Sequence, residues 1–162
     1  MSFDAFLKID GHDGESQDSK HKNEIEVLSY SFGGQQPASS GVGGGSGVGR
    51  VNIDDLAIVK HVDKSSPLLF VSLATGKHIP KAVLTVRKAG GDQQDFMTVT
   101  LSDLIVSSLH NTGQPTGTDG LPTEQMTLNF SKINWEYKEQ GADGSLKGTV
   151  QGGWDLKAAK KV

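Results

Sequence analysis

The glycine-rich stretch Gly41–Gly49 is the segment whose composition comes nearest to a binding motif. Exposed backbone N–H groups in such a stretch can hold phosphate when a helix follows, as in a P-loop. Here, however, Arg50 stands where a P-loop has lysine, and Val51 stands where a Ser or Thr hydroxyl would hold Mg²⁺. We therefore expect no nucleotide site. The composition predicts a flexible surface loop at about residues 35–50, or a loop that becomes ordered only against a partner.

Side chains that bind metal ions are present but not grouped. The histidines lack the close pairing on one helix or strand that zinc sites use; they are His12, His21, His61, His78 and His110. An acidic group has the composition of a calcium loop without the spacing of an EF-hand; it comprises Asp10, Asp13, Glu15 and Asp18. The sequence predicts a solvated acidic loop, no metal site, and a helix-end or interface role for His78.

Motifs for covalent or hydrolytic catalysis are missing from the sequence. There is no Gly-x-Ser-x-Gly turn, no His-Glu-x-x-His helix and no cysteine for nucleophilic, disulfide or thiolate–metal chemistry. We expect no catalytic residue, no cofactor and no enzymatic activity. A binding or structural role is favoured.

Chain length and net charge limit the number of domains and the kinds of partner. A chain of 162 residues fits one domain, and 16 Lys and Arg against 19 Asp and Glu, with a net charge of -3, indicate neither nucleic acid nor an acidic membrane surface as partner. Residues 1–8 lack a basic segment followed by an apolar one, and no window approaches the roughly 20 apolar residues of a membrane span. The protein is expected to be made in the cytoplasm and, if exported, to leave without a cleaved signal peptide.

The elements that would position such residues are mostly strands. Alternation of apolar and polar residues, the period of a half-buried strand, recurs along the chain. It predicts strands at residues 3–9, 24–32, 81–87, 97–101, 125–138 and 149–156. Residues 89–92 provide a glycine-containing turn for an antiparallel hairpin. The tail after Leu156 is expected to fray.

The later strands change phase partway along. Between 125 and 138, the apolar positions are even up to Phe130 and odd from Ile133, so the buried face reverses near Ser131–Lys132. The same reversal occurs near Ser102–Asp103. A β-bulge would produce such a reversal, and bent strands suit a closed or nearly closed barrel.

One helix is expected at Pro67–Thr75, flanking or plugging the barrel. Ser66 is a suitable N-cap, proline suits the first helical position, and Gly76 can end the helix. Elsewhere, Trp135 and Trp154 are in phase with apolar neighbours. If they lie in the core, replacing either by Ala should cost about 3–5 kcal/mol; the alternative is an exposed aromatic at a contact surface.

Several segments, in order and at the expected overall length, resemble the haemolysin-coregulated protein (Hcp) family, the inner-tube proteins of type VI secretion. The matching stretches are Phe3–Ile9 with Gly14–Ser16, Glu24–Leu28 with Phe32–Gly33, the glycine run before Val51, Asp63–Pro67, Gly76–Ala82, Leu84–Gly91, Val106–Ser108, Leu128–Phe130 and Gly153–Trp154. They cover nearly the whole chain, and no single one is diagnostic.

This resemblance implies a mainly β protein, an antiparallel β-barrel of two sheets with one short flanking α-helix, assembled as hexameric rings with an open lumen. The rings stack into a tube inside a contractile sheath tipped by a spike, and the ring can hold effector proteins before delivery. The implied partners are further copies of the chain, sheath and spike proteins, and effectors. The candidate ring-stacking residues in the glycine-rich loop are Gly41, Gly43, Gly44, Gly45, Ser46, Gly47 and Gly49.

Ser29 and Ser31 are the candidate lumen-facing residues. The strand at 24–32 has no cleanly polar face, as expected if the core covers one side and a channel or neighbour the other. Small neutral hydroxyls would leave a channel wall smooth for cargo. The alternative is that both serines bond to local backbone groups at a strand end.

A second function from another class stays open, a monomeric β-module that binds a small ligand or carbohydrate. The mass in solution separates the two, because a ring would have about six times the 17.2 kDa of one subunit.

Overall fold

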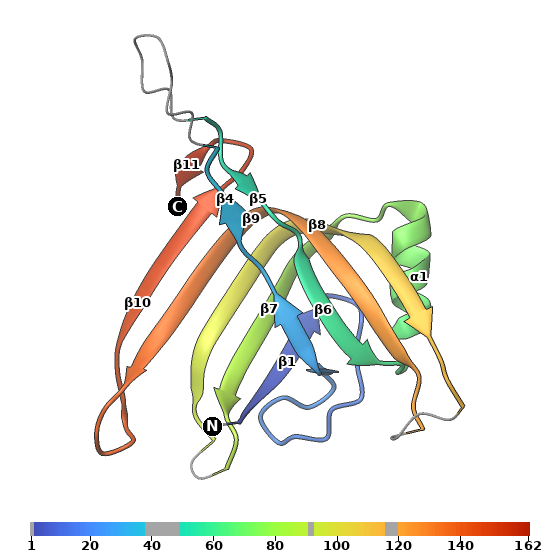
Figure 1. The fold of residues 1–162 in the computed structure, drawn as a ribbon, viewed down its shortest axis with the longest axis horizontal. Coiled ribbons are helices and arrows are strands. Elements are labelled where there is room, and N and C mark those ends of the chain that lie inside the picture. The colour runs from blue at the N-terminus through green and yellow to red at the C-terminus, as the bar shows by residue number, and fades with distance from the viewer. Residues whose placement is uncertain (1, 38–48, 91–92, 116–119) are drawn as a thin grey trace.

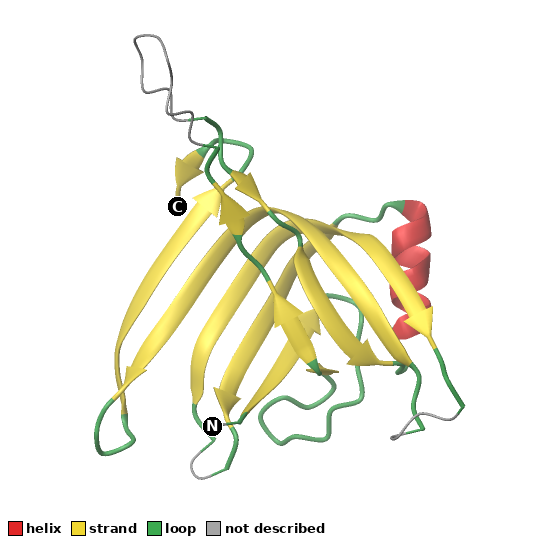
Figure 2. Cartoon of the chain, viewed as in Figure 1, coloured by secondary structure: helices red, strands yellow, loops and turns green. Residues whose placement is uncertain are grey.

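The computed structural model describes residues 2–37, 49–90, 93–115 and 120–162. In these ranges the chain is mostly β-structure with one helix (Figures 1 and 2). In chain order the elements are β1 Phe3–Ile9, β2 Ile25–Val27, β3 Ser29–Ser31, β4 Gly34–Gln35, β5 Asn52–Ile53, β6 Leu56–His61, α1 Ser66–Thr75, β7 Ile79–Lys88, β8 Asp95–Thr112, β9 Thr123–Gln140, β10 Leu146–Asp155 and β11 Lys160–Lys161.

The strands form one large antiparallel sheet and a small ribbon. The sheet runs in the order β11-β10-β9-β8-β7-β1-β2, and β6 adds to β9 and carries β3 on its other edge. The ribbon pairs β4 with β5. The predicted class, mainly β and antiparallel with one flanking helix, is confirmed. The barrel is not closed, because β2 bonds to β1 whereas β3 bonds to β6, and the chain leaves one ladder for the other at Leu28.

Strands β8 and β9 turn a corner together and give the molecule its arched shape (Figure 1). Leu101 and Leu104 of β8 are both buried, although residues three apart in a regular strand face opposite sides. Asp103 between them has a φ of 50°, and this left-handed conformation reverses the face. Its carboxylate accepts hydrogen bonds from Ser131 Oγ at 3.0 Å and Lys157 Nζ at 2.6 Å. The predicted reversal of the buried face is confirmed.

The corner contains no β-bulge, and that part of the prediction is wrong. The pairs on either side of it, Ser102 with Lys132 and Leu104 with Phe130, share one register. The extra residue of β8 lies further along the strand, at Ser107. The backbone therefore reverses the face by a change of φ and not by an inserted residue.

The core fills the space under the arch. Its members come from β1, β2, β6, β7, β8 and β9 and from one helix position; they are Ala5, Leu7, Ile9, Ile25, Leu56, Ile58, Leu69, Ile79, Ala82, Leu84, Val86, Met97, Val99, Leu101, Leu104, Val106, Met126, Leu128 and Phe130. Truncating one of the larger of these side chains to Ala is expected to cost about 2–5 kcal/mol, because a cavity remains. Neither tryptophan belongs to this cluster.

Helix α1 packs along β8 on the outside of the arch. It begins one residue earlier than predicted, and its N-cap is Ser65, not Ser66. Gly76 ends it with a φ of 63°, as expected for a glycine C-cap. The helix has 10 residues, and within the described ranges no helix is long and apolar enough to cross a membrane.

Three sequence expectations need correction. The strand expected at 24–32 is divided into β2 and β3, which join different ladders. Strand β6 was not expected at all. The tail does not fray, because β11 returns to pair with β10 through Trp154 and Lys161.

Candidate assembly and cargo surfaces

The candidate lumenal residues lie on one face of the sheet formed by β3, β6, β9 and β8. Neighbours in register share a face of a sheet, so two rows cross these four strands. One row is Ser31, Ala57, Thr127 and Ser108, and the other is Ser29, Val59, Gln125 and His110. We call these eight residues the small-residue wall. Five of them are small, namely Ser29, Ser31, Ala57, Ser108 and Thr127. Val59 is the one larger apolar side chain, Gln125 and His110 are longer polar ones, and none of the eight is an acid, a lysine or an arginine.

Ser29 and Ser31 are both exposed, and they alternate with the half-buried side chains of Tyr30 and Phe32. The register therefore directs the two aromatic rings toward the core and the two serines away from it. Among the described residues, neither serine hydroxyl makes a hydrogen bond to a backbone group, in contrast to the alternative in which both satisfy a strand end. Both hydroxyls point to solvent on the small-residue wall.

A fixed carboxylate borders this wall. Asp55 accepts a hydrogen bond from Asn129 Nδ2 at 2.8 Å and another from Ser107 Oγ at 2.6 Å. Asn129 and Ser107 belong to β9 and β8, so these bonds hold the segment before β6 against the neighbouring strands. These hydrogen bonds therefore hold together the strands that carry the wall, from residues at its border.

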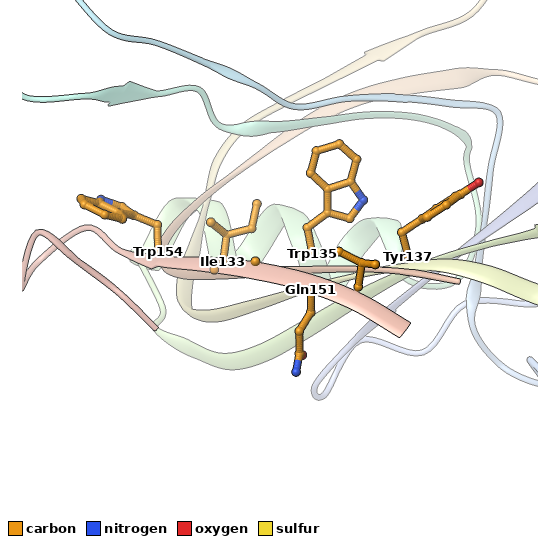
Figure 3. Close-up of a pocket in the computed structure, with 8 residues that line it drawn as sticks. Ile133, Trp135, Tyr137, Gln151 and Trp154 are labelled. Carbon is orange, nitrogen blue, oxygen red and sulfur yellow. The ribbon is translucent and has the colours of Figure 1, made fainter. Parts of the chain in front are cut away.

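A second surface lies at the other end of the molecule, on the paired ends of β9 and β10. Val150 lies opposite Tyr137, Gly152 opposite Trp135, and Trp154 opposite Ile133. Figure 3 shows Ile133, Trp135, Tyr137 and Trp154 on one face of this hairpin, with Gln151 on the other. We call the face shared by these three cross-strand pairs, without Gln151, the aromatic groove. Its cavity volume is about 480 Å³.

The aromatic groove corrects the expectation that both tryptophans are core residues. The side chain of Trp135 is 48% exposed, and Trp154 is only half-buried. Trp135 meets one ring from the body of the sheet, with its centroid 5.0 Å from that of Phe32 in an edge-to-face arrangement. The alternation of apolar residues in the sequence correctly predicted that the two tryptophans share a face with apolar neighbours. That face, however, is not covered by other elements. The alternative of an exposed aromatic surface holds for Trp135.

The two ends of the glycine-rich arm lie close together. A Cβ at Gly49 would be 3.0 Å from the carbonyl oxygen of Pro37, and Arg50 Nη2 donates to the carbonyl oxygen of Leu156 at 3.1 Å. Gln35 belongs to β4, so the arm starts after it. The other candidate stacking residues, Gly41, Gly43, Gly44, Gly45, Ser46 and Gly47, lie outside the described residues.

Several of the histidines and acids make hydrogen bonds or ion pairs within the subunit. Asp18 accepts from Arg87 Nη2 at 2.5 Å, and this bond lowers the pKa of Asp18 to about 2. His12 Nε2 lies 2.7 Å from Ser72 Oγ and links the loop after β1 to α1. His78, in the short connection between α1 and β7, lies 3.0 Å from Asp103 Oδ1 through its Nδ1. In the described ranges, the His, Asp and Glu side chains form no cluster of three or more that could hold a metal ion.

The fold is mainly antiparallel β-structure with one flanking helix, and it leaves one polar and one apolar face open to solvent. A family model described as "Type VI secretion system effector, Hcp" matches residues 6–137. The chain belongs to this family, and it is a type VI secretion system protein.

Individual relatives agree. The chain is 45% identical over 159 residues to "Protein hcp1" of Pseudomonas aeruginosa, with 97% of both chains covered. Its fold is similar to a solved "type six secretion system protein" at 31% identity, with a TM-score of 0.93 and 99% and 100% of the two chains covered. It is also similar to Hcp1 from Salmonella typhimurium at 39% identity, with a TM-score of 0.80 and full coverage of both chains.

Proposed function

We propose that this protein is the inner-tube subunit of a type VI secretion system and that it assembles into hexameric rings which stack into an exported tube. Family membership supplies the secretion context. The structural observation that carries the proposal is the small-residue wall, a set of eight residues across four strands that includes no acid, lysine or arginine and only one apolar side chain larger than alanine, Val59. Such a face is suited to line a channel, because it offers no strong binding contact to a protein that passes along it.

The lumen of this ring takes effector proteins as cargo. Ser29 and Ser31 line it, together with their cross-strand neighbours Val59 and Ala57. Short hydroxyl and methyl groups can contact cargoes of different sequence weakly, which favours loading and later release. A wall of long charged side chains would instead select one charge pattern.

The chain acts structurally and not as an enzyme. Its partners are further copies of itself, the surrounding sheath, the spike at the tip and the effector inside. It reaches the cell exterior through the secretion apparatus.

Ring stacking uses the arm that leaves β4 and returns to β5. Pro37 and Gly49 lie close together, so the arm leaves and rejoins the sheet at one place. A heterologous contact between one ring and the next is enough for open-ended stacking. The sequence of the arm is rich in glycine and has few apolar side chains, so we expect the adjacent ring to supply the contacts that order it.

Electron microscopy of the purified protein tests this proposal. We expect rings with a central opening and, at high concentration, stacks of rings. Particles without an opening, or only single subunits, would contradict it.

A further inference from the structure

Helix α1 presents its apolar stripe to solvent. Positions i, i+3, i+4 and i+7 of a helix form one face, and here they are Pro67, Phe70, Val71 and Ala74. All four are exposed, with Phe70 at 61% and Val71 at 58% of their full exposure.

The inward face of α1 is the more polar one. The buried helix residues are Ser66, Leu69 and Ser72, and both serines use their hydroxyl groups in hydrogen bonds with buried partners. A surface helix normally has the opposite arrangement, with apolar residues inward and polar residues outward. The inverted pattern indicates that the outer stripe is covered when the protein is assembled.

The aromatic groove is an open apolar surface that is complementary to the outer stripe of α1. It is lined by the apolar side chains of Ile133, Trp135, Tyr137, Val150 and Trp154, and Gly152 leaves a gap opposite Trp135 because a Cβ there would meet nothing within 4 Å. No charged side chain lines the groove, and the stripe of α1 carries none, so docking would bury no unpaired charge.

The dimensions agree as well. The stripe from Pro67 to Ala74 is about 10 Å long at the rise of an α-helix. The groove from Ile133 to Tyr137 is about 13 Å long at the rise of a strand. A single helix face therefore fits along the two paired strands, in the way that amphipathic helices occupy apolar grooves.

Within one subunit the two surfaces cannot meet. Figure 1 places α1 at one end of the long axis and the hairpin of β9 and β10 at the other. A pair of different, complementary surfaces at opposite ends of a molecule produces a heterologous contact, and repeated heterologous contacts close into rings.

We propose that the outer stripe of α1, centred on Phe70 and Val71, docks into the aromatic groove of the neighbouring copy of this chain and forms the apolar centre of the subunit interface. This inference rests on the proposed ring but adds the two surfaces that form it. Trp135 and Tyr137 are the aromatic anchors, a residue type that dominates binding energy at interface centres.

The absence of cysteine from the sequence allows a direct test. Val71→Cys and Val150→Cys together place the only thiols on opposite sides of the proposed contact. Treatment of the dilute double variant with a short bismaleimide should give a ladder of linked subunits up to the closed ring on a denaturing gel. Val71→Cys alone should stay unlinked, because a heterologous contact does not bring two copies of one residue together. Coexpressed single variants should give linked dimers and nothing larger.

Substitutions that remove apolar surface provide an independent readout. Phe70→Ser and Trp135→Ser should each weaken subunit association by about tenfold or more. Phe70→Leu and Trp135→Phe are the matched controls and should keep the ring. Circular dichroism and thermal unfolding of each variant exclude loss of the fold as the cause.

The outcomes separate the two proposals. Rings of native mass that give no more linked product in the double variant than in the single ones would overturn the α1–groove contact and leave the ring standing. An unchanged association constant in Phe70→Ser and Trp135→Ser would also overturn the contact. A wild-type protein that stays monomeric would contradict the proposed ring itself.

Discussion

The ammonium group of Lys60 lies 2.8 Å from Oε2 of Glu124, and both side chains are buried. The two residues are cross-strand neighbours on β6 and β9. Ser66 at the start of α1 joins them, since its hydroxyl lies 3.1 Å from Lys60 Nζ and donates to Glu124 Oε2 at 2.8 Å. This buried cluster therefore fixes the helix to the strands that carry the small-residue wall.

Breaking the cluster on one side should be costly. We expect Lys60→Met and Glu124→Leu each to reduce the free energy of unfolding by about 3–5 kcal/mol, because each change breaks a buried ion pair. Lys60→Met leaves the buried Glu124 carboxylate without a cation, and Glu124→Leu leaves Lys60 with Asp63 as its remaining carboxylate, at 3.2 Å. The combined variant Lys60→Met/Glu124→Leu should lose much less than the sum. Urea unfolding at one fixed protein concentration measures these changes, since association contributes to the apparent stability. Additive losses would show that the pair is not coupled.

Asp18 gives the protein an acid-sensitive contact. The hydrogen bond from Arg87 lowers the pKa of Asp18 from 3.8 to about 2. A carboxyl group with a lowered pKa in the folded state stabilises the fold above its unfolded pKa, and this stabilisation disappears as the pH falls through the folded pKa. The melting temperature of wild type should therefore exceed that of Asp18→Asn at neutral pH, and the gap should close between pH 3.8 and about 2. A gap that stays constant down to the lower pH would contradict this assignment.

Local signals in the sequence predicted the regular elements well. Strand β1 was placed correctly at both ends, the antiparallel pairing of β7 with β8 was expected, and Gly76 ends α1 as predicted. Each depends on short-range physics, namely alternation of side chains or the freedom of glycine at positive φ. Strand β6 was missed because Lys60 occupies a core-facing position and breaks the apolar alternation. Its partner Glu124 is distant in sequence, so only the pairing of β6 with β9 explains it.

The surfaces were less accessible to prediction. The sequence indicated Ser29 and Ser31, but the rest of the small-residue wall depends on the registers of three strand pairs. The alternation of apolar residues placed Trp135 on an apolar face, but alternation alone does not distinguish a face covered by other elements from one open to solvent. The corner at Asp103 was located correctly, whereas its mechanism depends on a backbone angle that residue type alone does not fix.

The arm should be dispensable for folding and required for stacking. We expect replacement of residues 38–48 by Asn-Gly, a two-residue turn that suits closely spaced chain ends, to leave the melting temperature and the ring mass nearly unchanged. Tube formation and secretion should fail, because the contact with the adjacent ring is lost. A control variant keeps the length of the arm and changes only Val42 and Val48 to Ser. Tubes and normal secretion from the shortened protein would show that the arm has no role in stacking.

The lumenal assignment of Ser31 predicts a cargo phenotype. Ser31→Gln introduces a longer side chain at an exposed position of β3, so ring mass and melting temperature should stay as in wild type. The amount of a coexpressed effector that copurifies with the ring should fall severalfold, because the added groups crowd the channel wall. Ser19→Gln, at an exposed position of the loop between β1 and β2 and outside the wall residues, is the matched control. Equal copurification with Ser31→Gln and wild type would remove Ser31 from the cargo surface.

Mass in solution tests the account most directly. Size-exclusion chromatography with light scattering reads the mass of the wild-type protein without reference to shape. A hexameric ring would give a species near 103 kDa, which is six times the 17.2 kDa of one subunit, and we expect this species to persist on dilution to the concentrations used for secretion assays. A single species at 17.2 kDa throughout this range would contradict the account and would favour a protein that acts as a monomer.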